Sequence, residues 1–297
     1  MQIGNTKIVD TFAEAFGMVY ARLIVTAFDA HWLNAASVEM CGYGSSVIAC
    51  DAEVGLERLL PPSETPDGRP GAAILAFGFS AEALTKAVMK RVGQCVMTCP
   101  STAVFDGLPH SEKRLPLGKS LRYFGDGFQK SKQVGETRYW RIPVMDGEFL
   151  CVESLGIEKG VAGGNIIFQA VDQPTALTAA RRAIDALTHL PNVMAPFPGG
   201  VARSGSKVGS RYKGLAASTA EASCPTLRGR CESQVVEGAN CVLEIVLDGT
   251  TEEAVATGMK TCLHAAAGEG VLAITAGNYG GKLGKFHFHL RDLVESP

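Results

Sequence analysis

The stretch GANCVLEIVLDGTTEEA, residues 238–254, combines a strand pattern with the start of a helix. Between residues 241 and 248 every second side chain is Cys, Leu or Ile, and this period of two predicts a β-strand. Thr250 or Thr251 is suited to cap a following helix, because Glu252 and Glu253 would stand in its first turn. The stretch therefore predicts a strand that leads directly into a helix ending near Ala267.

Strands and helices recur along the chain in one repeated order. In the first half, strands are expected at 18–27, 45–50, 72–79 and 94–99, and helices at 29–41 and 81–92. In the second half, strands are expected at 164–171, 241–249 and 270–277, an extended segment at 192–198, and helices begin near Pro174 and Thr251. Each half repeats strand–helix–strand, as in the split βαβ of a ferredoxin-like plait. The predicted fold class is α+β, with two related ferredoxin-like lobes packed together.

The repeat divides the chain into two lobes. Residues 1–150 form the N-terminal lobe, which includes an inter-lobe excursion at 103–150 with Asp-Gly turn signals, and residues 151–297 form the C-terminal lobe. Each lobe would carry two helices on one face of a four-stranded sheet. The other face needs a cover, which the sister lobe or another subunit would supply.

The composition is typical of a folded protein that binds neither nucleic acid nor a membrane. Of the 297 residues, 46% are hydrophobic and 20% are charged, and a net charge of −2 offers no basic surface to nucleic acid. Apolar runs have strand length, and the N-terminus lacks the pattern of a signal peptide. The nine cysteines form no CxxC pair, which favours free thiols in a reducing, cytoplasmic setting.

Glycine-rich segments stand beside the predicted strands. APFPGGVARSGSKVGSRYKG (195–214) adds cations that could hold phosphate or carboxylate, although a solvated flexible loop explains it equally well. Similar segments are VAGGN (161–165), AGNYGGKLG (276–284), ETPDGRPG (64–71) and RVGQCVMT (91–98). Each could simply form turns. Their recurrence at strand ends predicts loops that line a cleft.

The sequence offers no convincing metal site or activated nucleophile. His287 and His289 share one face of a strand but lack a third ligand, so a surface pair is the better explanation. Cys95 is set in an apolar strand pattern, which favours a structural thiol over a nucleophile. We therefore expect no metal.

Glu244 is the unusual residue of the opening stretch. The alternation places it on the face away from the helices, together with Val242 and Val246. An acid among valines fits a partly dry cleft, where apolar neighbours would raise its pKa toward neutrality. The alternative is a structural carboxylate paired with an Arg or Lys.

Ten blocks together resemble the formylmethanofuran–tetrahydromethanopterin formyltransferase family over essentially the whole chain. The blocks are DTFAEAF (10–16), ETPDGRPG, GQCVMT (93–98), FGDG (124–127), VAGGN, APFPGG (195–200), SKVGS (206–210), CPT (224–226), EIV (244–246) and AGNYGGKLG. The resemblance implies transfer of a formyl group between the amine of methanofuran, or an analogue, and N5 of tetrahydromethanopterin. It implies no metal or prosthetic group, with both coenzymes acting as substrates, and a homotetramer built as a dimer of dimers.

The resemblance also implies residue roles. The EIV match assigns to Glu244 the role of the acid beside the formyl-transfer centre, and cations would hold the acidic coenzyme tails. The expected substrate-binding residues are Gly199, Gly200, Ser206, Lys207, Arg211, Gly163, Asn165, Asn278, Lys282, Gln94 and Cys95. The nearly neutral charge, unlike that of salt-adapted archaeal members, favours formaldehyde oxidation in a methylotrophic bacterium over methanogenesis. There the chain would associate with other subunits of a formyltransferase/hydrolase complex.

Two other functions fit the same residues. Ferredoxin-like plaits often serve as binding domains, so the chain could be a non-catalytic ligand-binding or scaffold subunit of a one-carbon complex. The second alternative function is an acyltransferase that holds a phosphorylated donor in the 195–214 loop.

Overall fold

The computed structural model describes residues 1–295. The chain forms two compact units: unit 1 joins Met1–Gly17 to the residues from Val161 onward, and unit 2 is Met18–Gly160. Strand β3 (Phe12–Thr26) contributes its beginning to unit 1 and the rest to unit 2, and β12 (Glu158–Ala170) likewise crosses the boundary. The expected division near residue 150 stays a prediction.

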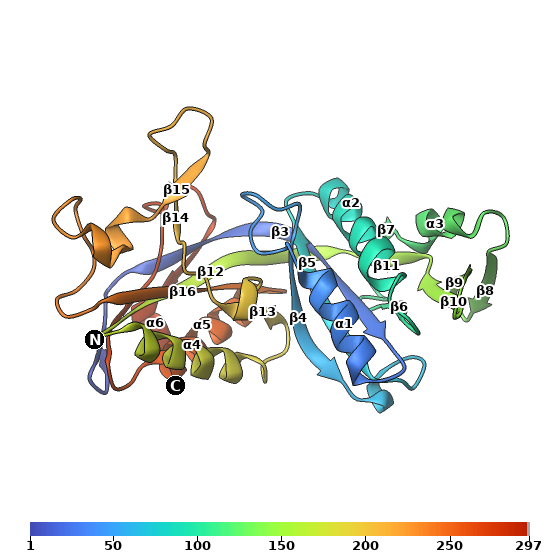
Figure 1. The fold of residues 1–297 in the computed structure, drawn as a ribbon, viewed down its shortest axis with the longest axis horizontal. Coiled ribbons are helices and arrows are strands. Elements are labelled where there is room, and N and C mark those ends of the chain that lie inside the picture. Colours follow the sequence, from blue (N-terminus) through green and yellow to red (C-terminus); the bar gives the residue numbers. More distant parts are fainter. Residues whose placement is uncertain (296–297) are drawn as a thin grey trace. The chain divides into compact units, whose positions relative to one another are not determined.

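Unit 2 contains one ferredoxin-like plait (Figure 1). Along the chain β3 is followed by α1 (Ala30–Cys41), β4 (Glu53–Leu60), β5 (Gly71–Gly78), α2 (Ala81–Arg91) and β6 (Ala103–Asp106). The sheet order is β4-β5-β3-β6, and all three pairings are antiparallel. The first and third strands of the plait are thus neighbours at its centre.

Unit 1 repeats this order of strands. After β12 come α4 (Gln173–Leu187), β13 (Val193–Met194), β16 (Cys241–Gly249), α5 (Glu252–Ala266) and β17 (Val271–Thr275). The sheet order is β13-β16-β12-β17, again antiparallel throughout. Because the two plaits share their element order and their strand order, the predicted α+β class with two ferredoxin-like lobes is confirmed.

Shorter elements extend both plaits. In unit 1 these are β1 (Gln2–Ile3), β2 (Thr6–Ile8), β14 (Ser206–Val208), β15 (Ala217–Thr219), β18 (Phe286–His289) and α6 (Leu290–Glu295). In unit 2 they are β7 (Arg114–Pro116), α3 (Gly118–Leu121), β8 (Lys130–Val134), β9 (Thr137–Val144), β10 (Gly147–Val152) and β11 (Ser154–Gly156). The predicted Asp-Gly turn at 146–147 joins the antiparallel strands β9 and β10. No helix within residues 1–295 combines the length and apolar character needed to cross a membrane.

The helices of each unit pack on a single face of its sheet. In unit 1, Ile166 and Phe168 of β12 and Ile245 of β16 enter the same buried cluster as Ala180 of α4 and Met259 of α5. Unit 2 has a corresponding cluster in which β3 and β5 contact α1 and α2. Burying these apolar side chains is the main favourable contribution to folding of each unit.

Polar caps fix the starts of the helices, as the sequence predicted at Thr250 or Thr251. The side chains of Asp29, Ser80 and Thr251 accept hydrogen bonds from the first-turn N–H groups of α1, α2 and α5. Asp172 caps α4 in the same way, with Pro174 in the first turn. These polar residues satisfy donors that a helix start leaves without intrahelical partners.

Two strand predictions were wrong. Residues 45–50 form turns, and Ile48 is largely exposed, because a run with only two large apolar side chains cannot anchor a strand in the core. Residues 94–96 continue the helical path of α2 in a π-helix over Val92–Val96, and residues 97–99 form a turn. Val92 and Val96 are both buried and lie four residues apart, so the helical spacing prevailed over the strand-like composition.

Candidate active site

Glu244 lies in the middle of β16, on the sheet face opposite the helices. Its neighbours Leu243 and Ile245 are buried, whereas Glu244 itself is half-buried. In the backbone register it is opposite Ile167 of β12. On the other edge of β16, the Glu244 amide donates to the Ala202 carbonyl at 2.9 Å, and the Ala202 amide donates to the Glu244 carbonyl at 2.8 Å. The backbone that carries this carboxyl is therefore held on both sides.

The carboxyl of Glu244 has an environment suited to proton transfer near neutral pH. Burial raises its pKa from 4.5 to about 7, the direction that its apolar neighbours predicted. Within residues 1–295 no Arg or Lys forms an ion pair with it. The structure therefore does not support the alternative of a structural carboxylate paired with an Arg or Lys. A carboxyl of this kind can both accept and return a proton.

A second segment, the loop 277–284, brings Tyr279 into the electrostatic field of Glu244. The pKa of the half-buried Tyr279 is raised first by burial and then by the carboxylates of Glu244 and Glu14. Its ring is tilted against that of Phe16, with centroids 6.3 Å apart. The phenol is a group that the sequence analysis did not select.

Glu14 of β3 is the second residue that the sequence analysis missed. Its side chain is 1% exposed, and its carboxylate accepts hydrogen bonds from the amides of Tyr279, Gly281, Leu283 and Gly284 at 2.6–2.9 Å. Desolvation raises its pKa, but the four hydrogen bonds together outweigh it and lower the pKa to about 2. The signal was present: an acid inside a strand, flanked by alanines, as Glu244 is flanked by apolar residues.

The two asparagines of the prediction support the same loop. The side-chain amide of Asn165 accepts from the Gly277 amide at 2.6 Å and donates to its carbonyl at 3.1 Å. The amide of Asn278 donates to Thr11 Oγ1 and to the Phe12 carbonyl. Their predicted contact with substrate stays a prediction. Lys282, also in this loop, is exposed.

Gly163 occupies a β-bulge in β12. The register between β12 and β16 shifts there, the φ of Gly163 is +94°, and its amide donates to Asp248 Oδ1 at 2.9 Å. A positive φ at a bulge favours glycine over any residue with a side chain. Its expected role in substrate binding stays a prediction beside this structural one.

The glycine-rich segment 195–214 approaches Glu244 at its middle. Gly199 and Gly200 both have positive φ, and Gly200 leaves no room for a side chain beside Ile184. After Ala202 pairs with Glu244, the chain passes Gly205, where a side-chain carbon would stand 4.0 Å from the Glu244 carboxyl. The backbone therefore comes close to the carboxyl at a residue that carries no side chain.

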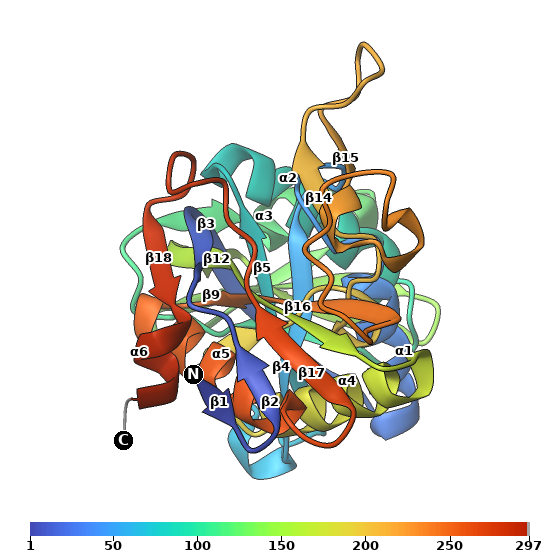
Figure 2. The same cartoon turned by 90° about the vertical axis from the view of Figure 1, so that its left-hand side faces the viewer.

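The cationic part of this segment projects from unit 1 as the hairpin β14–β15 (Figures 1 and 2). Ser206 and Lys207 lie on β14, and Arg211 lies in the connection; all three are exposed. Lys207 forms an ion pair with Glu221. An exposed hairpin with this charge can reach an anionic group that lies away from Glu244.

Gln94 and Cys95 belong to unit 2, in the π-helix, and not to a strand end as expected. The Gln94 carbonyl accepts a hydrogen bond from Thr98 Oγ1. Burial, followed by the charge of Glu39, raises the pKa of the Cys95 thiol. A raised pKa disfavours the thiolate that a nucleophile would need.

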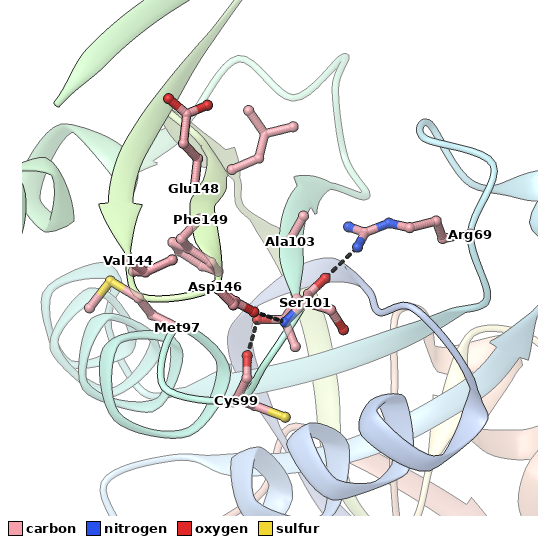
Figure 3. Close-up of a pocket in the computed structure, with 11 residues that line it drawn as sticks. Arg69, Met97, Cys99, Ser101, Ala103, Val144, Asp146, Glu148 and Phe149 are labelled. Carbon is pink, nitrogen blue, oxygen red and sulfur yellow. Dashed lines mark hydrogen bonds between the residues drawn. The ribbon is translucent and has the colours of Figure 1, made fainter.

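Unit 2 also contains a cavity of about 230 Å³, which Figure 3 shows. Arg69 of the ETPDGRPG segment lines it, but its guanidinium already binds Asp67, Thr26 Oγ1 and the Ser101 carbonyl. Asp146, on the same wall, accepts from the Ser101 amide at 2.6 Å. These charges hold the loops of unit 2 in place. Over residues 1–295 no three His, Cys, Asp or Glu side chains converge as metal ligands.

Comparison with known proteins gives one consistent result. The family model of formylmethanofuran–tetrahydromethanopterin formyltransferase matches residues 1–144, and that of its proximal lobe matches residues 147–293. The formylmethanofuran–tetrahydromethanopterin formyltransferase of Methylococcus capsulatus is 52% identical over 99% of this chain and 100% of its own.

Solved structures agree with the sequence matches. The corresponding formyltransferase from Methanosarcina barkeri has a TM-score of 0.94 at 44% identity, over 99% of this chain and all of its own. A chain of the formyltransferase/hydrolase complex from Methylorubrum extorquens, crystallised with methylofuran, has a TM-score of 0.96 at 48% identity, over 100% of this chain and 99% of its own. Full-length matches at this identity establish homology, and this chain therefore belongs to the formylmethanofuran–tetrahydromethanopterin formyltransferase family.

Proposed function

We propose that this chain moves a formyl group between N5 of tetrahydromethanopterin and the amine of methanofuran or an analogue. The single observation that carries the proposal is the half-buried carboxyl of Glu244, whose pKa burial raises to about 7. The names of full-length relatives supply the substrates. Transfer between two amines needs a group that takes a proton from one nitrogen and gives one to the other, and Glu244 suits that task.

The proposed reaction proceeds by direct attack in a ternary complex. The attacking amine nitrogen forms a bond to the formyl carbon, and the carbonyl electron pair moves to oxygen. Ionised Glu244 accepts the proton that the attacking nitrogen loses. When the oxyanion collapses, the bond to the other nitrogen breaks, and protonated Glu244 returns the proton to that nitrogen. Holding both coenzymes in line would supply about 7–11 kcal/mol of the barrier.

The surrounding loops have two proposed tasks. Backbone amides of the glycine-rich segment near Gly205 would stabilise the oxyanion, as fixed amide dipoles do in other acyl transfers. The exposed cations Lys207, Arg211 and Lys282 would hold the acidic tails of the coenzymes. No metal and no prosthetic group has a part in this scheme.

The assembly and the metabolic setting are also proposals. The Methylorubrum extorquens relative is named as one of the subunits of a formyltransferase/hydrolase complex, and it is 48% identical over 99% of this chain. We propose a similar association here, with this chain as a dimer of dimers and with flux through formaldehyde oxidation. Its 52% and 48% identity to the Methylococcus capsulatus and Methylorubrum extorquens relatives exceeds the 44% that it shares with the Methanosarcina barkeri enzyme, which favours the bacterial setting.

The test is an absorbance assay of the purified chain with formylmethanofuran and tetrahydromethanopterin. Formyl transfer that depends on both coenzymes supports the proposal. Binding of both without turnover would instead identify a ligand-binding or scaffold subunit, and size-exclusion chromatography with light scattering tests the tetramer.

A further inference from the structure

Glu14 is a buried carboxylate whose side-chain hydrogen bonds all go to one loop. Oε2 accepts from Tyr279 at 2.7 Å and from Gly281 at 2.9 Å, and Oε1 accepts from Leu283 and Gly284, each at 2.6 Å. The side chain is 1% exposed, and four donors satisfy it. A carboxylate so enclosed has no room to contact a coenzyme, so any function it has must pass through the loop.

The loop depends on this carboxylate for its shape. Leu283 is 54% exposed, so burial of its side chain does not hold the loop in place. Gly280 and Gly281 have φ of +74° and +72°, and a side-chain carbon on Gly284 would stand 2.4 Å from the Ala15 carbonyl. The backbone thus curls around the Glu14 carboxylate, and its four amides point inward at the negative charge.

The same loop carries Tyr279 and begins near the residue of β12 that lies opposite Glu244. The Tyr279 amide is one of the four donors to Glu14. Two residues earlier the loop starts at Gly277, where a side-chain carbon would stand 3.6 Å from Ile167, the residue opposite Glu244 in the register of β12 and β16. Burial, and then the carboxylates of Glu244 and Glu14, raise the pKa of the phenol. The ring also contacts Phe16, two residues along β3 from Glu14. The buried carboxylate is therefore bound directly to Tyr279, through the amide of that residue.

We propose that Glu14 is a positioning residue that shapes loop 277–284 and thereby holds the Tyr279 phenol beside the Glu244 carboxyl. Its kinetic consequence rests on the proposed formyl transfer. The Glu14 carboxylate takes no proton and touches no substrate. It fixes the distance and direction from which the phenol faces the reacting atoms.

The decisive variant is Glu14→Gln, which keeps the size of the side chain but has one acceptor oxygen in place of two. In either orientation its NH₂ group faces two backbone N–H donors, so two of the four hydrogen bonds from the loop are lost. We expect faster hydrogen exchange at the amides of residues 279–284, in a protein whose far-ultraviolet circular dichroism is unchanged. Unchanged protection of these amides would overturn the proposal, whether or not the chain transfers formyl groups.

A double-mutant cycle tests the route through Tyr279. Glu14→Gln should lower kcat about 10- to 100-fold, the range expected for misplacing a group by about 1 Å. In a Tyr279→Ala background the same change should lower kcat less than about threefold, because the phenol it positions is absent. If the two effects instead multiply, Glu14 acts independently of Tyr279 and the proposal is wrong.

A second variant covers the case in which Glu14→Gln does not fold. Asn278→Ala removes the side chain's bonds to Thr11 Oγ1 and the Phe12 carbonyl and the bond that it accepts from the Gly280 amide, and it leaves the Glu14 carboxylate intact. It should loosen the same loop and lower kcat by a smaller factor, again only when Tyr279 is present. An Asn278→Ala effect that is equal in both backgrounds would contradict the proposed route.

Discussion

Ala202 and Glu244 exchange both of their backbone hydrogen bonds, although they stand 42 positions apart in the chain. The pairing attaches the glycine-rich segment to β16 at the residue whose carboxyl has a pKa of about 7. A loop that moves relative to Glu244 must therefore bend after Ala202. This arrangement separates the fixed beginning of the segment from its projecting cationic hairpin.

Glu244→Gln should lower kcat by about 10²-fold or more and change KM little. The substitution keeps the shape of the side chain and removes the group that accepts the proton. Steady-state kinetics with both coenzymes measures the effect. The matched control is Glu253→Gln, an exposed acid in the first turn of α5, which should behave as wild type. Near-normal kcat in a folded Glu244→Gln protein would leave Glu244 a structural acid.

The pH profile of kcat should rise through pH 7 and then level off. Attack requires ionised Glu244, so the rate should fall about tenfold per pH unit well below its pKa of about 7. The residual activity of Glu244→Gln should not show this fall in rate below pH 7. A wild-type rate that is flat between pH 5 and 8 would exclude Glu244 as the base.

Ionised Glu244 should also reduce stability at alkaline pH. Its folded pKa is raised from 4.5 to about 7, so the cost of ionisation grows as pH rises through this interval and is complete above it. Glu244→Gln should therefore be more stable than wild type by about 1–3 kcal/mol at pH 8, and by much less at pH 4. Urea unfolding at the two pH values measures the difference, and an equal difference at both would contradict the assignment.

Glu14 should produce the opposite pH dependence. Its folded pKa is lowered to about 2 from 4.5, so its contribution to stability is complete above about pH 5 and is lost as pH falls toward 2. The expected contribution at neutral pH is about 3 kcal/mol. Glu14→Gln should flatten the urea-unfolding free energy between pH 5 and 2. The same slope in both proteins would assign acid unfolding to other carboxylates.

Lys207→Ala should raise KM far more than it lowers kcat. The exposed ammonium pairs with Glu221 and stands on a hairpin that leads away from Glu244, so it can bind a coenzyme tail without reaching the reacting atoms. Arg181→Ala is the control, because Arg181 is an exposed cation on α4, which covers the opposite face of the sheet. A large loss of kcat at constant KM would place Lys207 in the reaction centre.

The sequence predicted the fold where local signals agreed with one another. Period-two apolar patterns found β16 and β12, and capping residues such as Thr251 marked the helix starts. The signals failed at 45–50 and 94–99, where short apolar runs carry no clear period. In the second case a π-helix prolonged α2, a feature that depends on packing rather than on composition.

The candidate site was predictable in part, for a physical reason. Glu244 stands out because it breaks the pattern of its own strand, which is visible within one segment. Glu14 is as unusual locally, but its meaning depends on amides that lie 265–270 residues further along the chain. Only the folded β3 brings the carboxylate and the loop together, so no short stretch of sequence contains both the Glu14 carboxylate and its four amide donors.

The bulge at Gly163 determines which side chains of β12 lie on the helix side of the sheet. Before it, Val161 lies opposite Gly249, on the helix side; after it, Gly164 lies opposite Leu247, on that side again, so the alternation changes from odd to even numbers at one residue. Gly163 is therefore one residue more than β16 has over the same length, and because it is bulged out, Val161 and Phe168 both stay in the core. In evolutionary terms, a strand that bulges out one residue can gain or lose that residue without turning either of its ends over.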